Sequence, residues 1–280
     1  MNPLSLAPLT ITHATPTEYI EAAAQAGFDA VGLRVVAPAG VVEEPPIAGN
    51  EARLREVERC LTANGLSVLD VNSFWITSAT TREDFRPVLE AACRVRAGSI
   101  LTVISDDDIG RASAVFAECC ALAEPAGLKV ALEFMPYGSV RNLGEAADIV
   151  ERSGFRNAGI VLDVLHLFRS GGGPADLAGV PAERLAFVQI CDAPLRAPAF
   201  DALRAEARGG RLYPGQGELP LFDLMRALPP GIALDVETPC AAASNLSAFE
   251  QARRAADTTR RFLADWEQHR PQSAAERGAF

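Results

Sequence analysis

Lysine is almost missing from this sequence: Lys129 is the only one, so arginine carries nearly all of the strong positive charge. An enzyme that forms a Schiff base with its substrate would therefore depend on Lys129. This residue begins an apolar run instead of ending one, which is the wrong end of a strand for catalysis in a parallel α/β fold. The scarcity of lysine thus argues against Schiff-base chemistry.

Histidine and net positive charge are also scarce. The chain has three histidines, and 36 acidic residues against 26 basic ones give a net charge of −10. Because binding to the phosphate backbone requires a basic face, nucleic acid is disfavoured as a partner. The acidic balance is compatible with a small-molecule substrate.

Long apolar runs and paired cysteine motifs are absent. No run approaches the roughly 18 apolar residues that a membrane-spanning helix needs, and residues 1–8 contain no charged leader followed by an apolar core. The six cysteines form no CxxC motif and fall mostly within helix or strand patterns, as reduced core thiols do. We expect a cytoplasmic protein without a membrane segment.

What the sequence does contain is a regular alternation of short apolar runs and amphipathic segments. Eight runs are expected as strands: Leu6–Ile11, Ala30–Val36, Ser67–Trp75, Ser99–Ile104, Val130–Phe134, Ile160–Leu162, Leu185–Ile190 and Ile232–Val236. Helices are expected between them, for example over Glu18–Ala26, Glu51–Asn64, Thr81–Arg96, Gly144–Ser153 and Leu246–Glu267, with another starting at Asp106–Asp108.

Alternating strands and helices predict a parallel sheet. Eight such units favour a closed (β/α)8 TIM barrel of the α/β class over a doubly wound sheet, and no glycine-rich phosphate motif follows the first strand. We predict one domain over residues 1–267 and a polar C-terminal tail over 268–280.

Polar side chains end four consecutive strands of this predicted barrel. They are Glu133 in A-L-E-F-M-P, Asp163 in V-L-D, Gln189 in V-Q-I-C-D and Glu237 in L-D-V-E-T-P. The C-terminal ends of barrel strands converge on one mouth, so these four side chains should meet there. Three carboxylates in one apolar mouth repel each other unless a cation neutralises them, which predicts a divalent metal site. An all-oxygen donor set suits Mn²⁺ or Mg²⁺ better than Zn²⁺, with Co²⁺ as a further alternative.

The motifs E-F-M-P, L-D-V-L-H, V-Q-I-C-D-A-P and P-G-Q-G-E-L-P-L make the chain resemble the xylose isomerase-like barrel superfamily, in its sugar phosphate isomerase/epimerase group. The resemblance extends over nearly the whole chain. It implies that one divalent metal binds at the ends of strands five to eight, and that His166, in the Asp-x-x-His pattern with Asp163, faces the substrate. Many members have histidine where this chain has Gln189, whereas members resembling bacterial 3-dehydroshikimate dehydratases have glutamine.

Further residues are expected to contact a substrate. His166 should lie at the mouth because it follows Asp163 by three residues, and His13 follows the first strand. Trp75, at the end of the third strand, would supply an apolar wall. The thirty residues from Asp192 to Leu221 are too long for an ordinary connection, and we interpret them as a lid over the mouth. Basic candidates for binding a carboxylate or phosphate are Arg169, Arg208 and Arg211.

The leading functional hypothesis is a metal-dependent isomerase or epimerase of a small polyhydroxy carbonyl compound, with Glu133 and Glu237 exchanging protons beside the carbonyl. The alternative is a dehydratase (a lyase) of the 3-dehydroshikimate type, which Gln189 favours. An abasic-site endonuclease would need more histidine ligands and a basic face. A non-catalytic ligand-binding barrel and the formation of a homodimer are left open by the sequence.

Overall fold

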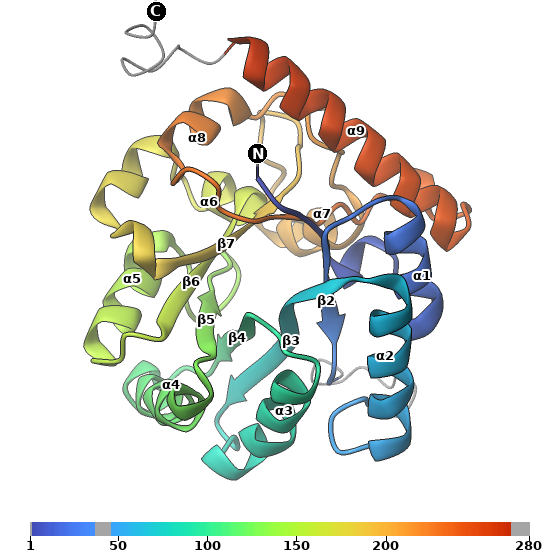
Figure 1. The fold of residues 1–280 in the computed structure, drawn as a ribbon. Helices are drawn as coiled ribbons and strands as arrows, with labels where there is room; N and C mark the ends of the chain where they lie inside the picture. Colours follow the sequence, from blue (N-terminus) through green and yellow to red (C-terminus); the bar gives the residue numbers. More distant parts are fainter. Residues whose placement is uncertain (1, 37–45, 270–280) are drawn as a thin grey trace, which may run out of the picture.

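The computed structural model describes residues 2–36 and 46–269. Its eight strands pair in sequence order, all parallel, and β8 closes the ring against β1 (Figure 1). The strands are β1 (Leu4–Leu6), β2 (Ala30–Arg34), β3 (Ser67–Thr77), β4 (Ser99–Ser105), β5 (Lys129–Glu133), β6 (Ala158–Asp163), β7 (Leu185–Ile190) and β8 (Leu234–Val236). The predicted single-domain (β/α)8 barrel is therefore confirmed.

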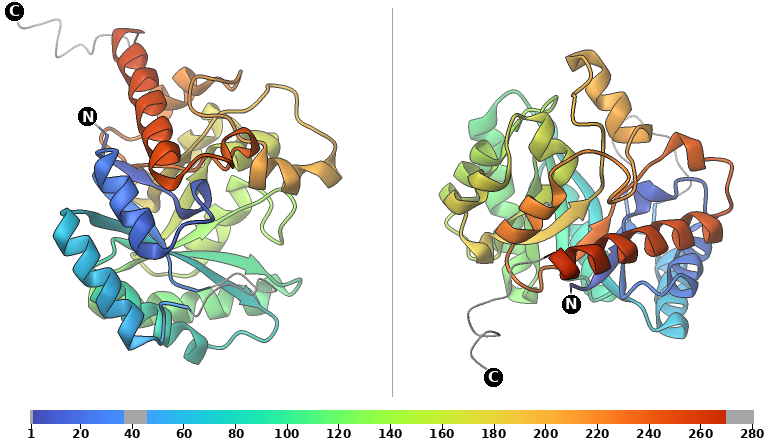
Figure 2. Two further views of the ribbon diagram at one scale, coloured as in Figure 1. Left: turned by 90° about the vertical axis from the view of Figure 1, so that its right-hand side faces the viewer. Right: turned by 90° about the horizontal axis from the view of Figure 1, so that it is seen from above.

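Helices surround this barrel and cover its outer face, except for α7, which lies at the mouth (Figures 1 and 2). They are α1 (Pro16–Gln25), α2 (Glu51–Asn64), α3 (Arg82–Arg94), α4 (Ile109–Ala123), α5 (Leu143–Arg152), α6 (Val164–Arg169), α7 (Leu203–Gly209), α8 (Leu221–Ala227) and α9 (Ala248–His269). The long C-terminal helix α9 lies against α1, so the two ends of the described chain close the ring together. Within the described ranges, no helix is both long and apolar enough to cross a bilayer.

Local sequence signals account for many of the helix ends. Asn50 caps α2 by accepting a hydrogen bond from the backbone N–H of Arg53 at 3.2 Å, and Gly65 ends the helix with a left-handed φ of 65°. Asp108 caps α4 in the same way, by accepting from the N–H of Arg111. The run Asp106–Asp108 thus marks the start of a helix, as the sequence indicated.

Two expectations about the strands and loops need correction. The first strand was expected over Leu6–Ile11, but β1 ends at Leu6 and Pro8–Thr10 form a 3-10 turn. Proline has no N–H for a strand ladder and its fixed φ suits the first position of a helical turn. No helix was predicted within the lid over Asp192–Leu221, but this segment contains the short helix α7.

The predicted C-terminal tail over residues 268–280 falls almost wholly outside the described residues. α9 continues to His269, two residues beyond the predicted end of the last helix.

The barrel interior is apolar on one side and polar on the other. Strands β4 to β7 fill it with the buried side chains of Leu101, Val103, Ala131, Val161 and Phe187. The buried polar side chains Ser5, Asp70 and Asp235 come from β1, β3 and β8. This layer of side chains closes the barrel below its C-terminal end, so chemistry is confined to the mouth above it.

Candidate functional site

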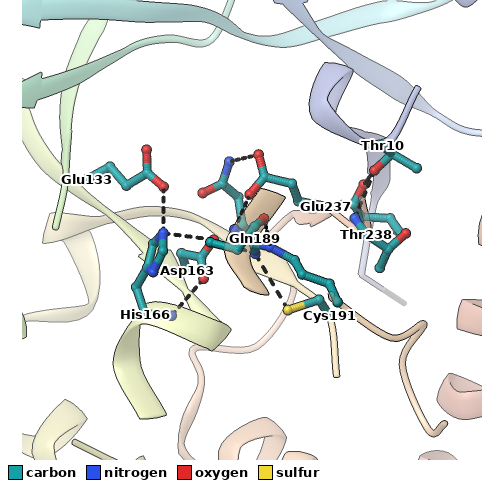
Figure 3. A network of polar contacts seen from close by, with 11 residues as sticks. Thr10, Glu133, Asp163, His166, Gln189, Cys191, Glu237 and Thr238 are labelled. Carbon is teal, nitrogen blue, oxygen red and sulfur yellow. Dashed lines mark hydrogen bonds and ion pairs between the residues drawn. The ribbon is translucent and has the colours of Figure 1, made fainter. Parts of the chain in front are cut away.

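The four side chains that the sequence placed at the strand ends come together at the barrel mouth (Figure 3). Glu133 and Asp163 are the last residues of β5 and β6, Gln189 is the penultimate residue of β7, and Glu237 directly follows β8. Asp163 and Gln189 are register partners across β6 and β7, which fixes their side chains next to each other. Glu133, Gln189 and Glu237 line one cavity of about 580 Å³.

Asp163 positions His166 through the backbone. Its carboxylate Oδ1 caps α6 by accepting a hydrogen bond from the N–H of His166 at 2.9 Å. The first turn of α6 then directs the imidazole to the mouth, where its Nε2 lies 3.8 Å from Oε1 of Glu133 and 4.0 Å from Oδ2 of Asp163. Tyr137 packs edge-on against the imidazole, with ring centroids 5.5 Å apart. The three-residue spacing therefore positions His166 because Asp163 is the N-cap of the helix that carries it.

Arg211 lies inside the cluster, which the sequence analysis did not foresee. It was expected on a lid facing the substrate, but its side chain is 1% exposed and joins two of the carboxylates. Its Nη1 donates to Oδ2 of Asp163 at 2.7 Å, and its Nη2 lies 2.9 Å from Oε2 of Glu237. A further hydrogen bond from its Nε to the carbonyl of Ala207, at 2.9 Å, fixes the guanidinium in this position.

The pKa values in the cluster follow from this arrangement. Burial raises the pKa of Glu133 well above its usual range, and the Glu237 and Asp163 carboxylates raise it further. Burial raises the pKa of Glu237 to about 8, although Arg211 opposes the shift. Burial would raise the pKa of Asp163 too, but Arg211 and His166 bring it down to about 2. Burial lowers the pKa of His166 to about 4, so its imidazole is neutral at pH 7.

The donor set fits a divalent cation. Metal binding needs the carboxylates in their ionised form, and three carboxylates with one guanidinium then leave a charge of −2 for the ion to balance. Gln189 donates from Nε2 to Oε1 of Glu237 at 3.1 Å, while its own Oε1 is buried without a hydrogen-bond partner in the described structure. Glu133, Asp163 and His166 each bring one ligand atom within 4.8 Å of the others. A cation at this point would use the unpartnered amide oxygen and balance the remaining charge.

The other residues expected to contact substrate divide into two groups. Trp75 and Arg208 line the cavity together with Glu133 and His166. His13 lines a neighbouring pocket beside α1 instead. Arg169 does not line the cavity: its guanidinium forms an ion pair with Glu206, and both side chains are largely buried. The expectation that Arg169 is available to an anionic substrate therefore does not agree with the structure.

Several residues at the mouth were not predicted from the sequence. Tyr137 and Arg141, from the loop after β5, line the cavity, as does Arg34 at the end of β2. Their signal was present, because each lies at or just beyond the C-terminal end of a predicted strand. Arg34 is the one charged residue in the apolar run Ala30–Val36.

Asp192 was also missed, and it anchors the segment that carries Arg211. Its two carboxylate oxygens accept hydrogen bonds from four backbone N–H groups, those of Ala193, Gly215, Gly217 and Leu219, at 2.8–3.1 Å. An antiparallel backbone bridge also joins Asp192 to Leu212, and Arg211 is the residue directly before Leu212. The bridge therefore holds the backbone at Arg211 close to the end of β7. The motifs V-Q-I-C-D-A-P and P-G-Q-G-E-L-P-L are thus two halves of one anchor.

Replacing Gly217 with alanine is expected to disrupt this anchor. A Cβ atom there would lie 2.4 Å from Oδ1 of Asp192 and 2.5 Å from the carbonyl oxygen of Ala193. We expect the free energy of unfolding to fall by at least about 2 kcal/mol, as in an overpacked core. Gly179→Ala is the matched control, because no atom lies within 4 Å of its added Cβ. Chemical denaturation measures both variants, and an equal effect in the two would contradict the expectation.

The sequence is similar to those of two kinds of characterised enzyme. Over 267 residues, 91% of this chain, the sequence is 31% identical to the 3-dehydroshikimate dehydratase of Pseudomonas aeruginosa; the match covers 39% of that protein. Over 150 residues, 52% of this chain, it is 33% identical to the inosose isomerase of Halalkalibacterium halodurans, covering 51% of it. The chain therefore spans well under half the length of the dehydratase it matches.

The fold has close structural counterparts. A crystal structure described as IolI protein with a binding zinc atom superposes with a TM-score of 0.78 and 19% identity, covering 94% of this chain and 99% of the other. Residues 20–266 match the family described as xylose isomerase-like TIM barrel, which is the range that holds β2 to β8 and all of the mouth cluster. The chain belongs to the xylose isomerase-like TIM barrel family.

Proposed function

We propose that this protein is a metal-dependent enzyme that removes a proton next to the carbonyl group of a small polyoxygenated substrate. The observation that carries the proposal is the convergence of three carboxyl groups and one unpartnered amide oxygen at the barrel mouth, with Arg211 as the cation paired to Asp163 and Glu237. When all three carboxyl groups are ionised, a charge of −2 remains for a metal ion to balance. The relatives named as dehydratase and isomerase support an enzymatic role.

The proposed metal ligands are Glu133, Asp163, Gln189 and Glu237. Nε2 of His166 lies close enough to Glu133 and Asp163, at 3.8 and 4.0 Å, to share a metal ion with them. Their oxygen-rich set suits Mn²⁺ or Mg²⁺ best, and the zinc described for the structural counterpart keeps Zn²⁺ and Co²⁺ among the alternatives. When bound, such an ion polarises the substrate carbonyl and so makes the neighbouring C–H group more acidic.

The side chains around the ion site have the protonation behaviour that proton transfer needs. The pKa of Glu237, about 8, allows its carboxyl group to take up or release a proton near neutral pH, and burial raises the pKa of Glu133 in the same direction. Neutral His166, with its Nε2 directed to Glu133, offers a further acceptor or donor on the same side of the cavity. Trp75 and Tyr137 line the cavity and limit the access of water to the reacting groups.

Between the two reaction classes, the charge of the cavity favours the dehydratase. Arg141, Arg204 and Arg208 are exposed at its rim, and within the described chain no carboxylate pairs with Arg141 or Arg208. Arginines at a mouth suit an anionic substrate because they can bind a carboxylate in a bidentate manner. 3-Dehydroshikimate carries a carboxylate, whereas an inosose is uncharged. Gln189 and the match over 91% of the chain point the same way.

In this reaction the base takes the proton beside the carbonyl, the bond from the β-carbon to its hydroxyl breaks, and the acid returns a proton to the departing oxygen as water. The isomerase is the second candidate, supported by the inosose isomerase relatives over about half of the chain. In that reaction the same proton returns to a neighbouring carbon.

The test is an assay with 3-dehydroshikimate and with an inosose, each in the presence of Mn²⁺ and after chelation. Water loss from dehydroshikimate produces an aromatic acid with a new ultraviolet absorbance. We expect this signal with Mn²⁺ and its loss after chelation. Turnover of the inosose alone would favour the isomerase, and turnover of both substrates after chelation would refute a metal-dependent reaction.

Arg208 supplies a sharper test of substrate charge. Arg208→Gln is expected to raise KM for an anionic substrate by about tenfold, the usual effect of losing one charge-assisted contact. The matched control is Arg196→Gln, an exposed arginine that lies in the same connecting segment but does not line the cavity. An equal KM in the two variants would argue against recognition of a carboxylate at the rim.

Metal binding is expected to depend on pH. The metal-free protein holds a proton on Glu237 at pH 7, because the pKa of this carboxyl group is about 8. A metal ion must displace that proton, so its affinity should rise as the pH increases from 7 towards 8. Calorimetric titration with Mn²⁺ in two buffers of different ionisation enthalpy measures the protons released. Binding without proton release at pH 7 would contradict the expectation.

The absence of nucleic-acid and membrane partners and the cytoplasmic location stay predictions from the sequence. A homodimer stays an open alternative.

A further inference from the structure

Helix α7 carries part of the cavity wall but is too short to hold its own position. It has seven residues and no side-chain cap at its N-terminus. An isolated helix of this length is unstable in water, so contacts with the rest of the protein must fix it. Ala207 and the arginines Arg204 and Arg208 of this helix line the cavity, and Figure 2 shows α7 on the side of the molecule opposite the N-terminus.

A buried ion pair joins α7 to α6. Nε of Arg169 donates to Oε2 of Glu206 at 2.8 Å, and its Nη2 donates to Oε1 at 2.7 Å. The same Nη2 donates to the carbonyl of Pro194 at 2.8 Å, which ties down the chain that leads into α7. The two side chains are only 2% and 11% exposed. A bidentate pair shielded from solvent in this way is stronger and more directional than a surface ion pair.

The ion pair holds the face of α7 that lies away from the cavity arginines. Arg204 and Arg208 are four residues apart and share one face of the helix, whereas Glu206 is two residues from each and points to the other side. On the other helix, Arg169 lies one turn after His166. The pair therefore sets the distance between the arginines at the rim and the histidine at the reacting groups.

We propose that Arg169 and Glu206 form a latch that fixes α7 over the mouth, so that both are positioning residues for the capture of an anionic substrate. The inference rests on the proposed function for its substrate, but not for the latch itself. The latch assigns to Arg169 a role different from the anion contact that the sequence indicated.

The first experiment needs no substrate. In the full-length protein, Glu206→Ala removes both hydrogen bonds to Arg169, and Glu206→Gln keeps the shape but removes the charge. Hydrogen exchange in the peptide over residues 200–210 is expected to become at least about tenfold faster in Glu206→Ala and to change less in Glu206→Gln. Peptides from β5 and β6 should exchange at the wild-type rate. If Glu206→Ala folds poorly, the milder variant Glu206→Gln still tests the latch.

The matched control is Glu58→Gln. Arg94 contacts Glu58 in the same bidentate manner, with distances of 2.8 and 2.6 Å, but this pair joins α3 to α2. It does not line the mouth cavity. We expect Glu58→Gln to leave exchange over residues 200–210 unchanged.

The second experiment separates a positioning role from a merely structural one. With 3-dehydroshikimate, Glu206→Gln is expected to raise KM by about tenfold while kcat changes less than about threefold, because the reacting groups stay in place. The Glu58→Gln control should alter neither. Unchanged exchange over residues 200–210 together with an unchanged KM would overturn the latch. If the protein does not act on 3-dehydroshikimate at all, the proposed substrate fails, and the exchange result alone decides on the latch.

Discussion

Replacing Glu133 with glutamine is expected to leave the metal-free protein folded, with a melting temperature no lower than that of the wild type, while metal binding and turnover are lost. We expect the affinity for Mn²⁺ to fall at least about a hundredfold, more than the loss of a residue that only supports a ligand. The rate of turnover should fall at least as far, because the same carboxyl group is proposed to move the proton.

The position of Glu133 explains why the substitution should spare the stability of the metal-free protein but abolish metal binding and turnover. Its carboxyl group makes no hydrogen bond within the described structure, and burial together with Glu237 and Asp163 raises its pKa. The metal-free protein therefore gains nothing from the charge of this group and loses nothing when a neutral amide replaces it. A side chain kept only for packing would show neither a loss of metal affinity nor a loss of turnover.

Calorimetric titration with Mn²⁺ and thermal unfolding after chelation measure the two effects. Asp107→Asn is the control, because Asp107 is an exposed acidic residue that lines the same cavity outside the cluster. It should bind Mn²⁺ as the wild type does. Full metal affinity in Glu133→Gln would remove this residue from the proposed site.

Replacing Arg211 with methionine is expected to cost about 3–5 kcal/mol of folding free energy in the metal-free protein, the usual cost of removing one partner from a buried ion pair. In the wild type, the guanidinium nitrogens of Arg211 lie 2.7 Å from Oδ2 of Asp163 and 2.9 Å from Oε2 of Glu237. The substitution removes this positive charge from both carboxyl groups. Asp163, which is charged at pH 7, is then a buried carboxylate without its arginine partner, and this cost falls on the folded state alone. A divalent ion should reverse much of the loss, since it supplies positive charge at the same place.

Chemical denaturation with and without Mn²⁺ measures this prediction. The stabilisation by Mn²⁺ should be larger in Arg211→Met than in the wild type. Arg208→Met is the control: this arginine is exposed at the same mouth and no carboxylate pairs with it within the described chain, so its loss should change stability by less than about 0.5 kcal/mol. If Arg211→Met is as stable as the control, Arg211 does not balance the charge of the cluster.

The expectations about the fold succeeded where a single local signal decides the structure. The strand over Leu185–Ile190 and the helix over Glu51–Asn64 have the predicted bounds, because an apolar run and a capped amphipathic pattern each specify one element. The first strand was misplaced, since Leu9 and Ile11 continue the apolar pattern although Pro8 ends the ladder. The six-residue helix α6 and the seven-residue α7 were missed because such short elements show no full period.

By itself, the sequence determined that the polar side chains at the ends of strands β5 to β8 lie at the barrel mouth. Once eight parallel units are recognised, closure of the barrel brings Glu133, Asp163 and Glu237 together, because each ends a strand and all strands end at the same face. Only the tertiary structure decided the partners of the arginines. Arg211 lies inside the cluster, and Arg169 forms an ion pair with Glu206. A long, flexible arginine side chain can reach any of several carboxylates. Which carboxylate lies close enough is set by the packing of segments that are far apart in the chain.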